Sequence, residues 1–319
     1  MNTPLPATIL SGFLGAGKTT LLRHILNADH GEKIAVIENE FGAAPIDNDL
    51  LGDRATRITT LSNGCICCSS ANELERALLD LLAGLDRGEV DFSRLVIECT
   101  GMADPGPIIQ AFFSHEIINT RFLLDGVITL VDAVHAEQQL SRFPIAQAQV
   151  GFADRILLTK TDVAGDCEAL VRRLQAINAR APVYRVVNGD IPLTQLFGVE
   201  GFILNDRVTV AKPLFRPLIP TQNSVQSIVV YLDDAVELPV VSDFMESLLV
   251  KYADNLLRYK GILAIKDDPR RLLFQGVQRL YNADWDREWR ADEAKTSVLV
   301  FIGIDLPEAE IRAGFAALA

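Results

Sequence analysis

Short apolar runs alternate with segments of helical periodicity through residues 1–205 of this 319-residue chain. Runs rich in Ile, Val and Leu predict buried strands, whereas apolar residues spaced three and four apart predict amphipathic helices. The predicted strands are Ala7–Leu10, Lys33–Ile37, Ile58–Leu61, Leu95–Ile97, Val127–Val131, Ile156–Leu158 and Val183–Val187. The predicted helices are Leu21–Leu26, Asn72–Leu85, Pro105–Phe113 and Asp166–Ala179. Strands that alternate with helices are typical of an α/β domain with a mainly parallel sheet.

The pattern changes after a proline-rich stretch. Residues 206–224 include three closely spaced prolines and are expected to form an extended linker between a domain of residues 1–205 and a smaller one of residues 225–319. The smaller domain is expected to be α+β, because its predicted strands follow one another in succession. Its strands are Ser227–Leu232, Leu256–Ile265, Arg271–Val277 and Ser297–Ile304, and its helices are Leu238–Tyr252 and a last one beginning at Pro307.

Composition and charge exclude some partners. The chain has 42 acidic and 30 basic residues, a net charge of −12, which argues against nonspecific binding of nucleic acid. No apolar run approaches the roughly 20 residues of a membrane span, and the N-terminus has no basic, signal-like region. We therefore expect a cytoplasmic protein with neither a membrane nor a nucleic-acid partner.

The stretch Gly12–Thr20 fits the phosphate-loop pattern, in which Gly12 and Gly17 precede Lys18 and Thr19 between a strand and a helix. Glycines let the backbone turn its N–H groups inward, and the helix N-terminus favours an anion. In such a loop the lysine reaches the β- and γ-phosphates and the threonine hydroxyl binds Mg²⁺. The expected nucleotide contacts here are Gly12, Gly15, Ala16, Gly17, Lys18, Thr19 and Thr20.

A second nucleotide element begins where a buried strand ends at Glu98. An acid at this place can hold Mg²⁺ directly or through water, and the Gly101 N–H can approach the γ-phosphate because no side chain blocks it. Lys18, Thr19 and Glu98 are accordingly the candidate catalytic residues, with Thr19 and Glu98 as the Mg²⁺ ligands. Asp132 also ends a strand; a role in ordering Mg²⁺ or water and a purely structural cap both stay open.

A third element, Thr159–Asp162, follows a predicted strand directly. It fits the guanine-reading pattern Asn/Thr-Lys-x-Asp. The stem of Lys160 would pack along the base, and Asp162 would accept from the ring N1–H and the exocyclic amine. Adenine lacks that pair of donors, so Asp162 would disfavour ATP by being left buried without a partner. We expect Thr159, Lys160 and Asp162 to make GTP the nucleotide.

Three of the five cysteines lie within four residues, at Cys65, Cys67 and Cys68. Thiolates suit Zn²⁺, Cu⁺ and other soft or borderline ions, and so dense a group is unlike core packing. Three sulfurs leave a tetrahedral site one ligand short. Glu38 or Glu40 could complete it, or the fourth position could stay open for transfer of the metal. Redox sensing and inert thiols are the alternatives.

Together these residues resemble the CobW-like family of GTPases, which includes metallochaperones and cobalamin-related proteins. The resemblance rests on the phosphate loop, a switch segment, the cysteine motif, the Mg²⁺ and guanine elements and two C-terminal segments: Gly12–Thr20, Glu38–Gly42, Cys65–Cys68, Glu98–Gly101, Thr159–Asp162, Leu257–Gly261 and Leu273–Val277. It implies a P-loop NTPase fold with a smaller C-terminal α+β domain. It also implies a metal site at the cysteine motif. Two departures are Ala43, where family members often carry an acid, and the lack of a histidine-rich stretch, which argues against metal storage.

The resulting hypothesis is a Mg²⁺-dependent GTPase that also binds a transition metal and serves a client metalloprotein. Zn²⁺ is the first candidate for that metal, and Co²⁺ and Ni²⁺ are the alternatives. The switch segment and the cysteines follow strands of the same sheet, so GTP is expected to change metal affinity. No arginine finger or water-orienting glutamine is evident, and hydrolysis is therefore expected to be slow. Two other hypotheses stay open: an ATP-dependent P-loop kinase, and a metal or redox sensor with negligible turnover. The client and the oligomeric state, including a metal-dependent homo-oligomer, are left open as well.

Overall fold

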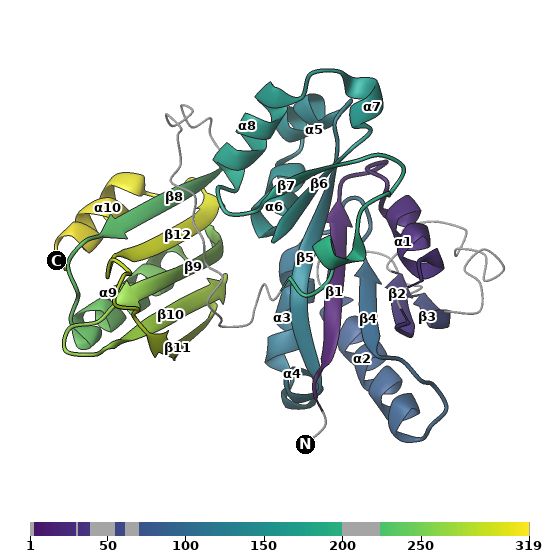
Figure 1. Ribbon diagram of the computed structural model, residues 1–319, viewed down its shortest axis with the longest axis horizontal. Coiled ribbons are helices and arrows are strands. Elements are labelled where there is room, and N and C mark those ends of the chain that lie inside the picture. Colours follow the sequence, from purple (N-terminus) through teal and green to yellow (C-terminus); the bar gives the residue numbers. More distant parts are fainter. Residues whose placement is uncertain (1–2, 30, 39–54, 61–69, 200–223, 319) are drawn as a thin grey trace. The chain divides into compact units, whose positions relative to one another are not determined.

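The computed structural model describes residues 3–29, 31–38, 55–60, 70–199 and 224–318 (Figure 1). Contacts divide the chain into two compact units. The first extends to Val171 and resumes at Ala181, and the second takes in Arg172–Arg180 together with the C-terminal part of the chain. The predicted linker, residues 206–224, lies outside the described residues except for Ser224.

The first unit contains a seven-stranded sheet with the order β3-β2-β4-β1-β5-β6-β7, in which every neighbouring pair is parallel (Figure 1). This confirms the predicted α/β class, and each predicted strand has its counterpart. The strands are β1 Leu5–Gly12, β2 Ile34–Glu38, β3 Ala55–Thr60, β4 Arg94–Glu98, β5 Phe122–Asp132, β6 Arg155–Thr159 and β7 Val183–Val186. The apolar runs of β1, β2, β4, β5 and β6 are buried because helices cover a parallel sheet on both faces.

The α-helices described before residue 199 include four short ones that the periodicity did not predict, and the last α-helix of this set, α8, is divided between the two units. They are α1 Lys18–Asn27, α2 Ser70–Asp86, α3 Pro105–Ser114, α4 Glu116–Arg121, α5 Ala136–Arg142, α6 Pro144–Phe152, α7 Thr161–Ala164 and α8 Glu168–Ile177. Helix α3 starts as its sequence dictates, because Asp104 accepts a hydrogen bond from the Gly106 N–H (2.8 Å) and Pro105 occupies the first turn. Helices α4 to α7 span at most nine residues, too few for a clear apolar period.

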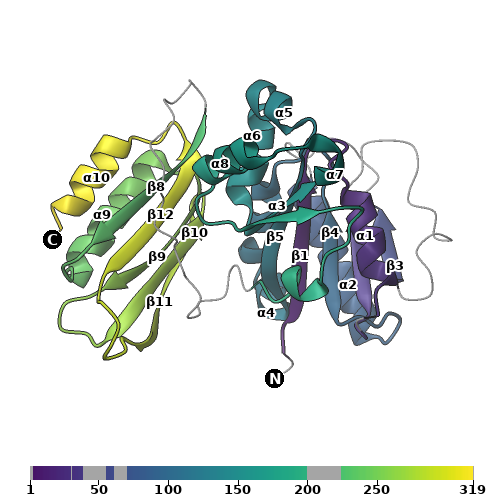
Figure 2. The same ribbon diagram turned by 45° about the horizontal axis from the view of Figure 1, so that its top comes forward.

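The second unit contains a five-stranded antiparallel sheet with the order β11-β10-β9-β12-β8. Helices α9 and α10 lie on the same face of this sheet (Figure 2). Their bounds, in chain order, are β8 Val225–Leu232, α9 Leu238–Tyr252, β9 Leu256–Ala264, β10 Arg270–Val277, β11 Leu280–Glu288, β12 Ser297–Ile304 and α10 Glu308–Ala316. The sequence did not predict β11. Otherwise the unit is the expected small α+β domain.

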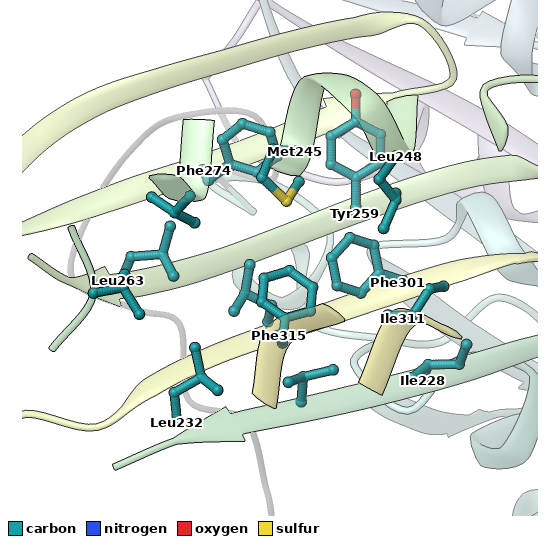
Figure 3. Packing of buried hydrophobic residues seen from close by; sticks show 14 of the residues in the cluster. Ile228, Leu232, Met245, Leu248, Tyr259, Leu263, Phe274, Phe301, Ile311 and Phe315 are labelled. Atoms are coloured by element: carbon teal, nitrogen blue, oxygen red, sulfur yellow. The ribbon is translucent and has the colours of Figure 1, made fainter. Parts of the chain in front are cut away.

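Aliphatic and aromatic side chains together fill the core between the second sheet and its helices (Figure 3). Phe301 of β12 lies between Tyr259 of β9 and Phe315 of α10, with ring centroids 6.4 and 5.6 Å away respectively. Tyr259 in turn stacks on Phe274 of β10 at 5.6 Å. Such offset and tilted contacts add to the large apolar area that each ring buries. They join three strands and the C-terminal helix into a single core.

Among the helices that the structure describes, none combines the length and apolar character needed to cross a membrane.

Candidate nucleotide-binding site

Four neighbouring strands of the first sheet end in residues that the sequence analysis singled out. Gly12 ends β1, Glu98 ends β4, Asp132 ends β5 and Thr159 ends β6. The strands are parallel and adjacent in the order β4-β1-β5-β6, so their carboxyl ends lie along a single edge. Ligands of open α/β sheets bind outside this edge. The fold therefore gathers three sequence-distant motifs into one site.

The phosphate loop has the left-handed backbone that its glycines permit. Gly12, Gly15 and Gly17 have φ values of 132°, 74° and 97°. At Gly12 a Cβ atom would lie 2.3 Å from the Leu130 carbonyl oxygen, so only glycine fits there. Helix α1 begins directly after Gly17. In such loops the N–H groups at the N-terminus of the following helix bind the phosphate.

Lys18 is buried and turned back onto its own loop. Its ammonium donates to the Gly12 carbonyl (2.8 Å) and the Phe13 carbonyl (3.2 Å). Burial lowers the pKa of Lys18 from its ordinary value, and the negative charge of Glu98 partly opposes that shift. Phosphate oxygens beside the ammonium would favour its charged form further. The loop thus holds a preformed cation at the place where the β- and γ-phosphates are expected.

Thr19 and Glu98 are in direct contact. The Thr19 hydroxyl donates to Oε1 of Glu98 over 2.9 Å, joining the first turn of α1 to the end of β4. Hydroxyl and carboxylate oxygens are the ligands that Mg²⁺ prefers, usually alongside substrate phosphates and water. The two oxygens that the sequence assigned to Mg²⁺ therefore fit that ion.

Gly101 packs directly against the phosphate loop. A Cβ atom at this position would lie 2.7 Å from the Leu14 Cα, so a side chain could not be accommodated. The Gly101 carbonyl also accepts from the side-chain amide of Gln149 (3.2 Å). The backbone at Gly101 is thus close to the loop, where the sequence analysis expected a γ-phosphate contact.

The segment Thr159–Lys160 contacts both the phosphate loop and β5. The Thr159 hydroxyl contacts the carbonyl oxygens of Ala16 (2.9 Å) and Val131 (3.2 Å). Lys160 has a left-handed backbone with φ 57°, and its ammonium donates to Oδ2 of Asp132 over 2.7 Å. The structure thus brings the lysine of the guanine pattern beside the loop.

Asp132 acts in this structure as the anchor of Lys160. Its Oδ2 also lies 2.9 Å from Nδ1 of His135. Burial raises the pKa of the Asp132 carboxyl, but hydrogen bonds from Lys160 and His135 outweigh burial and leave the pKa below its ordinary value. A carboxylate held in this way favours the structural alternative over a role in ordering Mg²⁺.

Asp162 and Thr20 lie at the exposed side of the site. Asp162 is in the first turn of α7 and its side chain is exposed, as is that of Thr20 in α1. An acceptor that reads a base must be accessible before the nucleotide binds. The arrangement is compatible with the expected role of Asp162.

Most of the predicted metal ligands fall outside the described residues: Glu40, Cys65, Cys67 and Cys68. Glu38, in contrast, is described and buried at the end of β2, where it pairs in register with Glu98 of β4. In the described part of the chain, no three His, Cys, Asp or Glu side chains group together as metal ligands.

The two described cysteines, Cys99 and Cys167, are buried and form no disulfide. Burial raises the pKa of the Cys99 thiol to about 12. A neutral buried thiol is a poor nucleophile and a poor metal ligand. Neither residue was a predicted ligand, and the structure gives no reason to add them.

Sequence reasoning missed Gln149 altogether. It belongs to α6, it is 1% exposed, and its amide nitrogen donates to the carbonyls of Gly101 (3.2 Å) and Ala103 (2.9 Å). The sequence signal is weak, because α6 carries two glutamines, Gln147 and Gln149, in an otherwise apolar stretch. Nothing in that pattern indicates which loop the amide contacts.

The parallel sheet, the phosphate loop with its buried lysine and the Thr159–Lys160 segment define a P-loop protein of the GTPase class. The chain belongs to the CobW family. Residues 6–185 match the CobW/HypB/UreG nucleotide-binding domain, and residues 225–319 match the cobalamin synthesis protein cobW C-terminal domain.

Individual relatives are similar over nearly the whole chain. The zinc chaperone YjiA of Escherichia coli is 65% identical over 315 residues, which cover 99% of each chain. The crystal structure of the Zn(II)-bound YjiA GTPase covers 100% of both chains with a TM-score of 0.86. The zinc chaperone CobW of Pseudomonas aeruginosa is 36% identical, over 96% of this chain and 89% of its own. These similarities extend through both units.

Proposed function

We propose that this protein is a metallochaperone that hydrolyses GTP to GDP and phosphate and couples that reaction to the binding and delivery of zinc. The observation that carries the proposal is the Thr19–Glu98 contact beside the phosphate loop, because it prepares two oxygens for the Mg²⁺ that accompanies GTP. The relatives named as zinc chaperones support zinc as the cargo.

The phosphate loop would bind the β- and γ-phosphates, with Lys18 neutralising charge as it builds up on the phosphate oxygens. Thr19 and Glu98 would hold Mg²⁺, which supplies further positive charge to the transferred phosphoryl group. Gly101 would contact the γ-phosphate through its N–H. Lys18 stays charged at neutral pH in this role, because the phosphates replace the water that burial removes.

The base would be read by Lys160 and Asp162. The contact between Lys160 and Asp132 supports this assignment, since it holds the lysine stem in one place before the base arrives. Asp162 would supply the acceptor that guanine satisfies and adenine does not. GTP is therefore the proposed substrate, in preference to ATP.

Zinc would bind Cys65, Cys67 and Cys68, with Glu38 or Glu40 as a further ligand. Co²⁺ and Ni²⁺ are alternative ions, because thiolate and carboxylate ligands do not select zinc on their own. The pairing of Glu38 with Glu98 supports coupling, since the proposed metal segment begins one strand away from the proposed Mg²⁺ ligand. Coupling of this kind is reciprocal: GTP would change zinc affinity by the factor by which zinc changes GTP affinity.

We propose a division of labour between a nucleotide domain of residues 1–205 and a C-terminal domain of residues 225–319, joined by a linker of residues 206–224. The separate family matches to the two parts support this division. The C-terminal domain would dock a client metalloprotein or form a metal-dependent homo-oligomer. The protein would act in the cytoplasm.

The test is phosphate release from GTP and from ATP by the full-length chain, with and without Zn²⁺, in reducing buffer. We expect slow turnover, a preference for GTP, and a rate or affinity that changes with Zn²⁺. Lys18→Ala should abolish turnover, and unchanged turnover would contradict the nucleotide assignment. Transfer of phosphate from ATP to an acceptor would favour a kinase. Negligible turnover together with thiol-dependent partner binding would favour a sensor.

A further inference from the structure

Gln149 contacts the backbone of the Gly101 segment, which also packs against Leu14 of the phosphate loop. Its side-chain nitrogen donates to the Gly101 carbonyl (3.2 Å) and to the Ala103 carbonyl (2.9 Å). A primary amide has two N–H groups, so each carbonyl can receive its own hydrogen. Since both neighbours are acceptors, the nitrogen rather than the oxygen of the amide must face this segment.

The segment that Gln149 contacts is tightly turned. The Ala103 N–H donates back to the Thr100 carbonyl over 3.0 Å, and Asp104 then caps the start of α3. Gly101 packs so closely against Leu14 that even a methyl group would clash. Gly101 is therefore held close to both the phosphate loop and the amide of Gln149.

Helix α6 is itself anchored to the strands that lead into the site. The Gln149 backbone carbonyl accepts from the Thr129 hydroxyl of β5 over 2.9 Å. Thr129 is the register partner of Ser11, which directly precedes Gly12 in β1. Both ends of the Gln149 residue, its backbone and its side chain, thus connect to segments that flank the phosphate position. Its side chain is buried, so water does not compete for these hydrogen bonds.

We propose that Gln149 is a positioning residue that holds Gly101 against the phosphate loop, so that the Gly101 N–H is already aimed at the γ-phosphate and the site distinguishes GTP from GDP. The proposal rests on the proposed function, because it assumes that a guanine nucleotide occupies this site. Within that function, the proposal assigns to Gln149 the selectivity of the Gly101 contact for nucleotides that carry a γ-phosphate.

The physical reason is preorganisation. A glycine has an unusually free backbone, so an unanchored Gly101 would lose conformational entropy each time it met a γ-phosphate. Hydrogen bonds to the carbonyls of Gly101 and Ala103 fix the Gly101–Met102 and Ala103–Asp104 peptide planes in advance. GDP has no γ-phosphate and gains nothing from this arrangement. Loss of the amide should therefore weaken GTP binding and leave GDP binding nearly unchanged.

The test compares Gln149→Met with Gln147→Met in the full-length chain. Gln147 is the matched control: it lies on the same helix, and its amide donates to the Leu140 carbonyl (2.7 Å), outside the Gly101 segment. Affinities for GDP and for a slowly hydrolysed GTP analogue are measured with Mg²⁺, together with single-turnover hydrolysis of GTP. We expect Gln149→Met to lower the affinity for the GTP analogue and the rate of hydrolysis at least tenfold each. The affinity for GDP should change less than threefold. Gln147→Met should preserve the wild-type ratio of the affinity for the GTP analogue to the affinity for GDP.

The positioning role would be overturned if Gln149→Met lowered the affinities for GDP and for the GTP analogue equally, or changed neither. Wild-type protein that binds neither nucleotide would instead contradict the proposed function, and the two failures are thereby distinguished. If Gln149→Met does not fold, Gln149→Asn provides the second variant, since it keeps an amide but withdraws it by one methylene. Gln149→Asn should lower the affinity for the GTP analogue relative to GDP in the same way. An unchanged ratio of the two affinities would count against the proposal.

Discussion

Glu38 and Glu98 are paired in register across the neighbouring parallel strands β2 and β4, each at the end of its strand. Residues paired in this way project from the same face of a sheet. Glu98 contacts Thr19 at the nucleotide site, and Glu38 opens the segment that leads toward the cysteines. Two carboxyl groups so placed feel each other's charge, so a cation bound by one changes the affinity of the other for its own cation.

Loss of either Mg²⁺ ligand should reduce GTP turnover. We expect Glu98→Gln and Thr19→Ala each to lower kcat by about 100-fold, the cost typical of removing one electrostatic group from an active site. The measurement is phosphate release over a range of Mg²⁺ concentrations. Thr120→Ala is the control, because that hydroxyl is exposed on α4 and bonds only its own helix backbone at Glu116. Equal rates for Thr19→Ala and Thr120→Ala would remove Thr19 from the site.

Base selectivity should depend on Asp162. Asp162→Asn replaces a charged acceptor by an amide and should lower the preference for GTP over ATP by about tenfold or more, as expected for a hydrogen bond to a charged group. Competition of each nucleotide against a fluorescent analogue measures the preference. Asp233→Asn, at an exposed aspartate of the second unit, should leave it unchanged. A preference that survives Asp162→Asn would place base recognition elsewhere.

The cysteines should separate into two classes. Cys99 and Cys167 are buried, and the Cys99 pKa of about 12 keeps its thiol protonated at pH 8. We expect iodoacetamide to spare both residues in the native protein. Cys65, Cys67 and Cys68 should react and should be protected by Zn²⁺, as peptide mapping by mass spectrometry can determine. Alkylation of Cys67 and Cys68 at the same rate with and without zinc would contradict the assigned metal site.

Gly12 should tolerate no side chain. Gly12→Ala combines a left-handed backbone with a Cβ atom 2.3 Å from the Leu130 carbonyl oxygen. A cost of at least about 3 kcal/mol in the free energy of unfolding is expected from strain and overpacking together. Gly31→Ala is the matched control, because Gly31 also has positive φ but open space, so only about 1 kcal/mol of strain applies. Urea unfolding, monitored by circular dichroism, measures the loss of unfolding free energy in each variant. Equal losses in Gly12→Ala and Gly31→Ala would refute the steric argument.

Acid should weaken the contribution of Asp132 to the free energy of unfolding. Its folded pKa lies below the ordinary value, so its hydrogen bonds stabilise the protein fully above that value and are lost as the pH falls through the folded pKa. Asp132→Asn should therefore cost about 1–3 kcal/mol near pH 7 and progressively less below pH ~4. Urea unfolding of both proteins between pH 3 and pH 7 measures the difference. A difference independent of pH would contradict a folded-state pKa of Asp132 below its ordinary value.

The elements around the nucleotide site were predictable because local signals agree there. Gly12 and Gly17 need glycine for their backbone angles, Lys18 and Thr19 need fixed spacing from them, and apolar runs flank the loop. Strand β11 gave no such signal. It lies at the edge of its sheet and carries exposed residues such as Asn282 and Asp284, so its solvent-facing positions and its acids conceal the alternation of a strand.

Contacts between distant segments escaped prediction for a different reason. Lys160 and Asp132 are 28 residues apart, and Gln149 is 48 residues from Gly101. Neither separation corresponds to a helical or strand period, so periodicity carries no information about these pairs. Only the order of the strands in the sheet brings the segments together. The motif residues were thus predictable, whereas the residues that hold them in place were not.

The central place of β1 in the first sheet has a consequence for how the protein is made. Strand β1 is synthesised first, yet its partners β4 and β5 follow only after β2, β3 and α2. A nascent chain therefore carries the complete phosphate loop long before it has the strands that flank it, and parallel pairing over such separations is slow. Nucleotide capture becomes possible only after β6 has left the ribosome, so binding of GTP would report that β1, β4, β5 and β6 have come together.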